Sequence, residues 1–268
     1  MRPTPYQLAV GFVTNFFDTL GIGSYATTTA AYKARGTVAD ERIPGTLNVG
    51  HALPTIVEAV IFIKVIEVDR LTLWTMIAAS VVGAWLGARA ISRWPRRRIQ
   101  RGMAIALVLT GLFMALRQLH FFPAGGDALG LSGARLLVAA LANGVFGALM
   151  TLGVGLYAPC MATVSLLGMN VTAAFPIMTG SCAFLMPVAS LPFMRAGAFD
   201  RRAALGLAIG GVPAVLIAAW FVKSLPLDAV KWLVVAVVLY TAATMWRSSL
   251  VPDESAPLPM AAVTPAGS

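Results

Sequence analysis

The chain has 268 residues, of which 58% are hydrophobic and only 12% are charged, and its formal net charge is +9. A soluble domain usually has about 25% charged residues, so these values exclude a soluble enzyme, a disordered or fibrous protein and a secreted disulfide scaffold. A spanning helix needs roughly 20 apolar residues, and the chain supplies enough of them for a multi-pass, all-α membrane protein.

The predicted elements begin with an interrupted helix. Two short apolar stretches, 6–18 and 26–34, flank a glycine-bearing segment, and a similar break separates the run 133–152 from the short run 156–168. The other apolar runs are 44–66, 71–92, 99–119, 171–194, 203–222 and 228–246. We predict a first transmembrane repeat over 1–118, a linker over 119–134, a second repeat over 135–248 and a disordered tail over 249–268.

An internal repeat supports this division. Residues 19–26 (TLGIGSYA) align with residues 151–158 (TLGVGLYA), 132 residues later, and six of the eight positions are identical. The same register, drifting by one residue, pairs Pro44 with Pro176, Pro54 with Pro187, Asp69-Arg70 with Asp200-Arg201 and Pro95 with Pro226. Collinear matches across a whole half indicate duplication, so we predict two homologous repeats of about four helical elements each.

Loop charges predict how the repeats are oriented. Six arginines lie in the loop 89–101 and three in the loop 195–202, and basic loops favour the cytoplasmic side of a membrane. Both loops reach that side if each repeat crosses an odd number of times, which inverts the second repeat relative to the first. The first element of each repeat must then be broken or re-entrant. This reading is favoured over a nucleic-acid-binding patch.

The breaks at 19–25 and 151–157 form the candidate binding site. Paired breaks in two repeats are typical of a transporter site, and half-helices beginning near Ala26 and Pro159 would direct their N–H groups at one anion. The alternative is that Gly-x-Gly only permits close helix packing. The candidate binding residues are Thr19, Gly21, Gly23, Tyr25, Thr27, Thr28, Asn48, Thr151, Gly153, Gly155, Tyr157, Pro159, Cys160, Thr179 and Ser181.

Three ionisable residues in the first repeat are candidates for coupling. Asp18 lies beside the first break, and His51 and Glu58 are seven residues apart, which places them on one face of the second helix. A carboxylate at the bilayer centre costs at least about 2.5–3.5 kcal/mol, so intramembrane acids indicate function. These groups could carry a proton with the anion. Alternatively, they are neutral or paired with Lys33 or Arg117 and only fix packing.

The duplicated Gly-x-Gly break, the proline-bearing second helix and the basic loop before the fourth helix resemble the TauE/SafE group of the 4-toluene sulfonate uptake permease family. The resemblance covers about 8–248, and its chemistry carries over only to the breaks 19–25 and 151–157. It implies a permease of the bacterial inner membrane for sulfite, an organosulfonate or a related small anion, including carboxylates.

The predicted function is secondary-active transport of a small anion by alternating access, driven by protons or the membrane potential. A non-transporting accessory membrane protein and a cation carrier using Asp18 and Glu58 are the alternatives. An enzyme is not expected, because the chain has neither a Gly-x-Ser-x-Gly nor a His-Glu-x-x-His motif. We expect the lipid bilayer as surroundings, no cofactor, no metal and no nucleic acid, and leave open whether the protein is a monomer or a homodimer.

Overall fold

The computed structural model describes residues 2–91, 93–121, 125–153 and 155–221, together with 239–240, 242–243, 246–247 and 250. Over these residues the secondary structure is helical apart from two isolated bridges, so the predicted all-α fold is confirmed. Five helices are long and apolar enough to cross a membrane. The predicted tail 249–268 and most of the predicted run 228–246 lie outside the described residues.

The helix bounds follow the apolar runs of the sequence. The first half contains α1 (Pro5–Thr19), α2 (Ser24–Arg35), the short turn η1 (Asp40–Arg42), α3 (Ile43–Val65), α4 (Arg70–Ile91) and α5 (Arg96–Gln118). The second half contains α6 (Gly133–Met150), α7 (Tyr157–Leu166), the short turn η2 (Val171–Ala173), α8 (Ala174–Arg195) and α9 (Arg201–Phe221). Both interrupted helices are therefore present.

The half-helices after the breaks begin two residues earlier than predicted, at Ser24 and Tyr157 rather than at Ala26 and Pro159. A side chain of α1 accepts the backbone N–H of Ser24, which stabilises an earlier start of α2. In α7, Pro159 falls inside the first turn, where its missing N–H leaves no hydrogen bond unmade.

Turns rich in basic residues gather at one end of the molecule. The backbone N–H of Asp200 donates to Thr46 Oγ1 over 2.8 Å, and Gln100 Nε2 donates to Asp40 over 2.7 Å. These bonds bring together the connections α2–α3, α4–α5 and α8–α9. We call this the basic end, because it carries the arginines of the loops 89–101 and 195–202.

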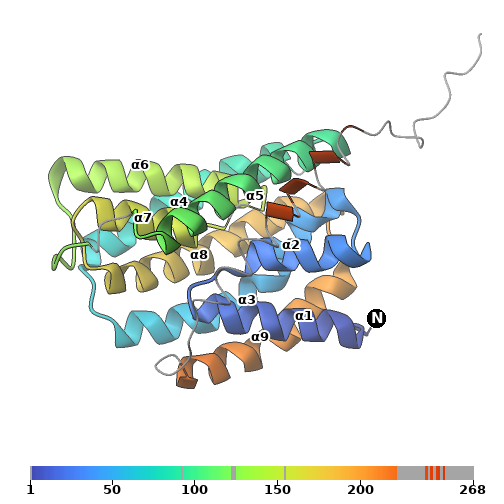
Figure 1. Ribbon diagram of the computed structural model, residues 1–268, viewed down its shortest axis with the longest axis horizontal. Coiled ribbons are helices and arrows are strands. Elements are labelled where there is room, and N and C mark those ends of the chain that lie inside the picture. The colour runs from blue at the N-terminus through green and yellow to red at the C-terminus, as the bar shows by residue number, and fades with distance from the viewer. Residues whose placement is uncertain are drawn as a thin grey trace, which may run out of the picture.

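The remaining turns meet at the opposite end. The backbone N–H of Asp69 donates to the carbonyl of Leu129 over 2.9 Å, and that of Asn170 donates to the carbonyl of Ala128 over 2.8 Å. Consequently α3 starts at the basic end, whereas its counterpart α8 finishes there. Figure 1 shows these equivalent helices running in opposite directions along the long axis, which is an inverted arrangement.

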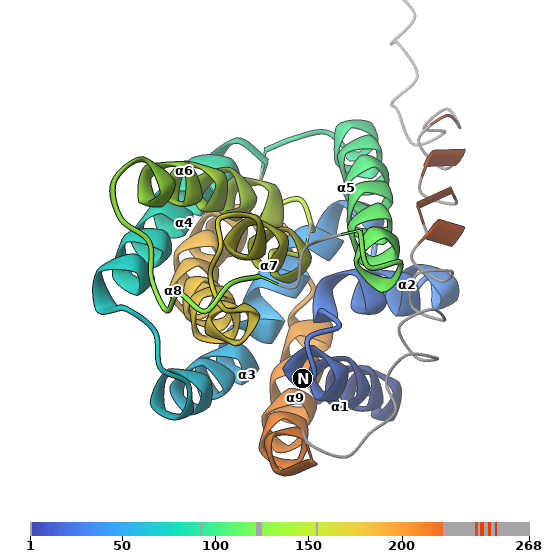
Figure 2. The same cartoon turned by 60° about the vertical axis from the view of Figure 1, so that its left-hand side comes forward.

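The helix contacts follow an approximate two-fold pattern. Helix α1 packs on α9 as its counterpart α6 packs on α4, and α3 contacts α9 as α8 contacts α4. Helices α3 and α8 also contact each other and are the most buried of the five spans. Figure 2 shows them inside the bundle, with the short helices α2 and α7 beside them. The two breaks are thus held next to the central pair.

Glycines permit the closest of these helix contacts. A Cβ atom at Gly83 of α4 would overlap the carbonyl oxygen of Gly144 in α6, and one at Gly147 would overlap the carbonyl oxygen of Ser80. On the related pair, a Cβ at Gly11 of α1 would lie 2.5 Å from the carbonyl oxygen of Gly206. Small residues that let backbones approach are typical of helix interfaces in membranes.

Candidate functional site

The first break depends on glycine backbone conformations. Gly21 and Gly23 have φ angles of 83° and 88°, in the region that residues with a side chain rarely adopt. Gly153 in the second break has a φ of 98°. At Gly155, a Cβ would meet nothing within 4 Å. The duplicated motif therefore builds a glycine-bearing interruption in each repeat.

A carboxylate of the chain occupies the start of α2. One oxygen of Asp18 accepts the backbone N–H of Ser24 over 2.7 Å, and the other accepts the Ser24 hydroxyl over 3.1 Å. Both residues are buried. The sequence predicted an external anion at this helix end, but here the chain itself supplies the negative charge.

The start of α7 has a different environment. Its N-cap residue, Leu156, makes no side-chain capping bond, and the position equivalent to Asp18 is Met150, which contacts the thiol of Cys182 at 3.6 Å between the sulfur atoms. Because the N-terminus of a helix favours negative charge, the backbone at Tyr157 retains the anion preference that Asp18 satisfies in α2.

A hydrogen bond links the second break to the first repeat. The hydroxyl of Tyr157 donates to Glu58 Oε2 of α3 over 3.1 Å, and both residues are buried. Asp18 lies close enough to Glu58, Tyr25 and Tyr157 to interact with each of them electrostatically. Asp18, Glu58, Tyr25 and Tyr157, which we call the acid–tyrosine cluster, therefore stand where the two breaks meet.

His51 belongs to a separate polar network on the first-repeat side. Its Nδ1 lies 3.0 Å from Asn15 Oδ1 and its Nε2 lies 3.0 Å from Thr28 Oγ1. The imidazole also lies beside the ring of Tyr25, with centroids 5.8 Å apart. Both ring nitrogens are thus bonded, which fits a positioning role for His51 between α1, α2 and α3.

Of the two cations weighed as partners for these acids, Lys33 is paired elsewhere. Lys33 forms an ion pair with Asp40 over 2.6 Å at the basic end. The side chain of Arg117 is outside the described part of the chain. Where side chains are described, no group of three His, Cys, Asp or Glu residues suits a metal ion.

Several buried oxygen atoms of the site have no protein partner among the described residues. They include the Tyr25 hydroxyl, Glu58 Oε1 and Asn48 Oδ1. Buried polar atoms are almost always hydrogen-bonded to protein or water, so these atoms are the strongest indication that a polar solute or water enters the cluster.

Most predicted hydroxyls bond within their own helices. Thr19, Thr27, Thr151 and Thr179 each donate to a backbone carbonyl three or four residues earlier. Ser181 accepts from the Asn143 amide over 2.9 Å, and Cys160 is a buried free thiol. The four threonine hydroxyls therefore already use their donor hydrogens, whereas Ser181 only accepts in its described hydrogen bond.

Sequence reasoning missed three polar residues of the site: Asn15, Ser24 and Asn143. Asn15 lies one helical turn before Asp18, and Ser24 is the position at which the two eight-residue motifs differ in polarity, since Leu156 replaces it. An amide or hydroxyl in an apolar helix was therefore the available signal. It could not have revealed the partners, which come from other helices.

The chain matches the family described as Sulfite exporter TauE/SafE over residues 1–114 and 135–268, which include both breaks and the acid–tyrosine cluster. A comparison with curated proteins gives no match. The resemblance inferred from the paired breaks is confirmed by the family match. Proteins of this family are membrane transporters rather than enzymes. The chain therefore belongs to the sulfite exporter TauE/SafE family of membrane transporters.

Proposed function

We propose that the protein is a secondary-active transporter of a small anion, such as sulfite or an organosulfonate, which binds where the two breaks meet. The observation that carries this proposal is the acid–tyrosine cluster, because it joins both breaks and contains buried oxygen atoms without a protein partner. Paired interruptions near the middle of inverted repeats are typical of substrate sites in secondary transporters.

Asp18 suggests how a proton is coupled to the anion. Its carboxylate holds the N–H and hydroxyl of Ser24, so a substrate anion can use these donors only after Asp18 is protonated or displaced. The nearby Glu58 adds a second acid, and a third negative charge in a buried site would be strongly unfavourable. Protonation therefore favours anion binding, and the two would move together.

The inverted arrangement suggests alternating access. Helices α1, α3 and α9 contact one another, and so do their counterparts α6, α8 and α4. Each group combines helices from both repeats, with one break beside it. Rocking of these two groups around the acid–tyrosine cluster would open the site alternately to the two ends of the molecule.

The basic end is assigned to the cytoplasm of a bacterial inner membrane. It carries the arginines of both loops, 89–101 and 195–202, and those loops line one common pocket. At the opposite end, Lys64, Arg70 and Arg135 are offset by Glu67, Asp69 and Asp127. The positive-inside rule supports this orientation.

Transport into proteoliposomes tests the proposal. A labelled alkanesulfonate is a suitable probe beside sulfite, because a sulfonate stays ionised and cannot cross the lipid as a neutral acid. We expect saturable uptake that is accelerated by an acidic outer solution. Gly23→Val and Gly155→Val should abolish uptake by filling the space at the breaks.

Gly36→Val is the matched control. Gly36 also has a positive φ, of 59°, and open space around its Cβ, but it ends α2 at the basic end. It carries the same backbone strain as Gly23→Val, and its uptake should persist. Unchanged uptake in both break variants would contradict the proposal, and absence of uptake by the unmodified protein would favour the accessory role. Uptake of a divalent cation instead of the anions would favour the cation carrier.

A further inference from the structure

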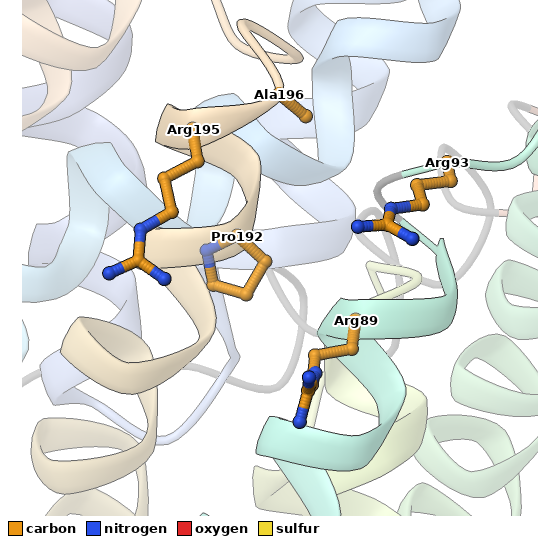
Figure 3. A pocket seen from close by; sticks show the side chains of 5 residues that line it. All are labelled: Arg89, Arg93, Pro192, Arg195 and Ala196. Atoms are coloured by element: carbon orange, nitrogen blue, oxygen red, sulfur yellow. The ribbon is translucent and has the colours of Figure 1, made fainter.

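A pocket lies between the two repeats at the basic end, away from the acid–tyrosine cluster. Its volume is about 330 Å³. It is lined by Arg89 in the last turn of α4, by Arg93 just after that helix, and by Pro192, Arg195 and Ala196 at the end of α8. Figure 3 shows Arg89 and Arg93 extending from the α4 side toward Pro192, with Arg195 descending along α8 beyond it.

The pocket has three positive charges and no described negative charge to balance them. The one ion pair between described residues joins Lys33 to Asp40, elsewhere at this end. Arg89 lies over the ring of Trp85, 4.6 Å from its centroid, which fixes the direction of its guanidinium. Guanidinium groups bind phosphate oxygens through paired hydrogen bonds, so the pocket suits a phosphate-bearing anion.

Apolar side chains lead away from the pocket along the outside of the bundle. On α4, Trp85 and Leu86 are 45% and 56% exposed, and on α8, Leu191 and Met194 are 46% and 51% exposed. All four lie within about two helical turns of the pocket-lining arginines of their own helix. A pathway for a free ion would be lined by polar groups, whereas this surface suits hydrocarbon chains.

We propose that the pocket binds the headgroup phosphate of an anionic phospholipid, whose acyl chains lie along the exposed faces of α4 and α8. Charge and apolar surface are adjacent in the order that such a lipid requires, and basic pockets between transmembrane helices are known to suit anionic headgroups. Because α4 and α8 belong to different repeats, the lipid would join the two halves at the basic end. This inference does not depend on which anion is transported.

Lipid retention by the purified full-length protein tests the proposal. The protein in detergent is mixed with equal amounts of phosphatidylglycerol and phosphatidylcholine that have the same acyl chains, and bound lipid is counted by native mass spectrometry. We expect retention of phosphatidylglycerol to exceed that of phosphatidylcholine at least about tenfold, because each basic residue near the headgroup favours the anionic lipid. The triple variant Arg89→Gln/Arg93→Gln/Arg195→Gln should lose that preference.

The matched control is Arg97→Gln/Arg98→Gln/Arg101→Gln, which removes the same charge from exposed positions of α5 outside the pocket. This control should keep the preference. The variant Arg89→Lys/Arg93→Lys/Arg195→Lys should keep it as well, which also shows that the site tolerates substitution. Equal loss in the pocket and control triples would overturn the proposal. So would thermal stabilisation by inorganic phosphate equal to that by phosphatidylglycerol, because the ligand would then be a free anion.

Discussion

Asp18 and Ser24 form a closed link across the first break, in which the carboxylate at the end of α1 accepts both the backbone N–H and the hydroxyl of the first residue of α2. A carboxylate in this position satisfies an otherwise unpaired helix N-terminus. It is also a local model of how an external anion would bind there. The link therefore explains the fold of the break and suggests competition between Asp18 and substrate.

The variant Asp18→Asn tests this competition. An asparagine oxygen can still accept the N–H of Ser24, so we expect the protein to remain folded. It cannot exchange a proton, and uptake of the alkanesulfonate should lose its acceleration by an acidic outer solution. The measurement is the initial uptake rate as a function of outer pH. The control Asp69→Asn changes an acid outside the spans and should keep the pH profile of the unmodified protein. If Asp18→Asn also keeps that profile, Asp18 does not carry the coupled proton.

The equivalent tyrosines offer a second, paired test. Tyr157→Phe removes the only described hydrogen bond of the Glu58 carboxyl group, and leaving a buried acceptor unpaired should lower the free energy of unfolding by about 1–3 kcal/mol. Tyr25→Phe removes a hydroxyl without a protein partner and should leave that free energy nearly unchanged. If the Tyr25 hydroxyl donates to the anion, this variant should raise the KM of uptake roughly tenfold.

Chemical unfolding in detergent and uptake kinetics, measured on both tyrosine variants, separate these effects. The pairing predicts that the variant with the larger loss of stability is Tyr157→Phe. A Tyr25→Phe variant with unchanged KM would remove Tyr25 from the binding site, and equal losses of stability would mean that the Glu58 hydrogen bond contributes nothing.

Local patterns were sufficient to predict much of the architecture. Apolar length located the five described spans, although the run 99–119 forms α5, which is not one of them. The Thr19 and Thr151 motifs located both breaks, because glycine permits the positive φ found at Gly21, Gly23 and Gly153. The loop arginines indicated the inverted arrangement, since a shared basic end requires equivalent helices to run in opposite directions.

Contacts between distant residues were beyond the sequence. The partner of Glu58 is Tyr157, 99 positions away, and that of His51 Nδ1 is Asn15, 36 positions earlier. Helix periodicity indicates the face on which a residue lies, but not which helix packs against that face. The same limit applies to Arg89 and Arg195, which share a pocket only because α4 and α8 pack together.

Asp69 provides a pH test outside the membrane spans. It precedes α4, and hydrogen bonds from the backbone N–H and hydroxyl of Thr72 lower the pKa of its carboxyl group. Because the pKa is lowered on folding, the Asp69 carboxylate stabilises the fold at pH values above the pKa of the unfolded state, which is about 3.9. This stability is lost as the pH falls through the pKa of the folded state. Asp69→Ala should therefore lower the melting temperature at neutral pH.

At a pH below the folded pKa of Asp69, the melting temperatures of Asp69→Ala and the unmodified protein should converge. Asp127→Ala, at the same end of the molecule, is the control and should leave the melting temperature unchanged at neutral pH. A difference between Asp69→Ala and the unmodified protein that stays constant down to strong acid would show that the side chain acts by packing rather than by its charge.

The contact between α4 and α6 should be the most sensitive to added volume. A Cβ at Gly147 would overlap the carbonyl oxygen of Ser80, and backbone atoms cannot move aside as a flexible side chain can. Gly147→Val should therefore lower the free energy of unfolding by about 1–3 kcal/mol or prevent stable folding. Ala134→Val places the same β-branched residue at an exposed position of α6, and it should change that free energy by less than about 0.5 kcal/mol. Thermal melting of both variants in detergent measures the difference, and similar melting temperatures would mean that α4 and α6 do not approach this closely.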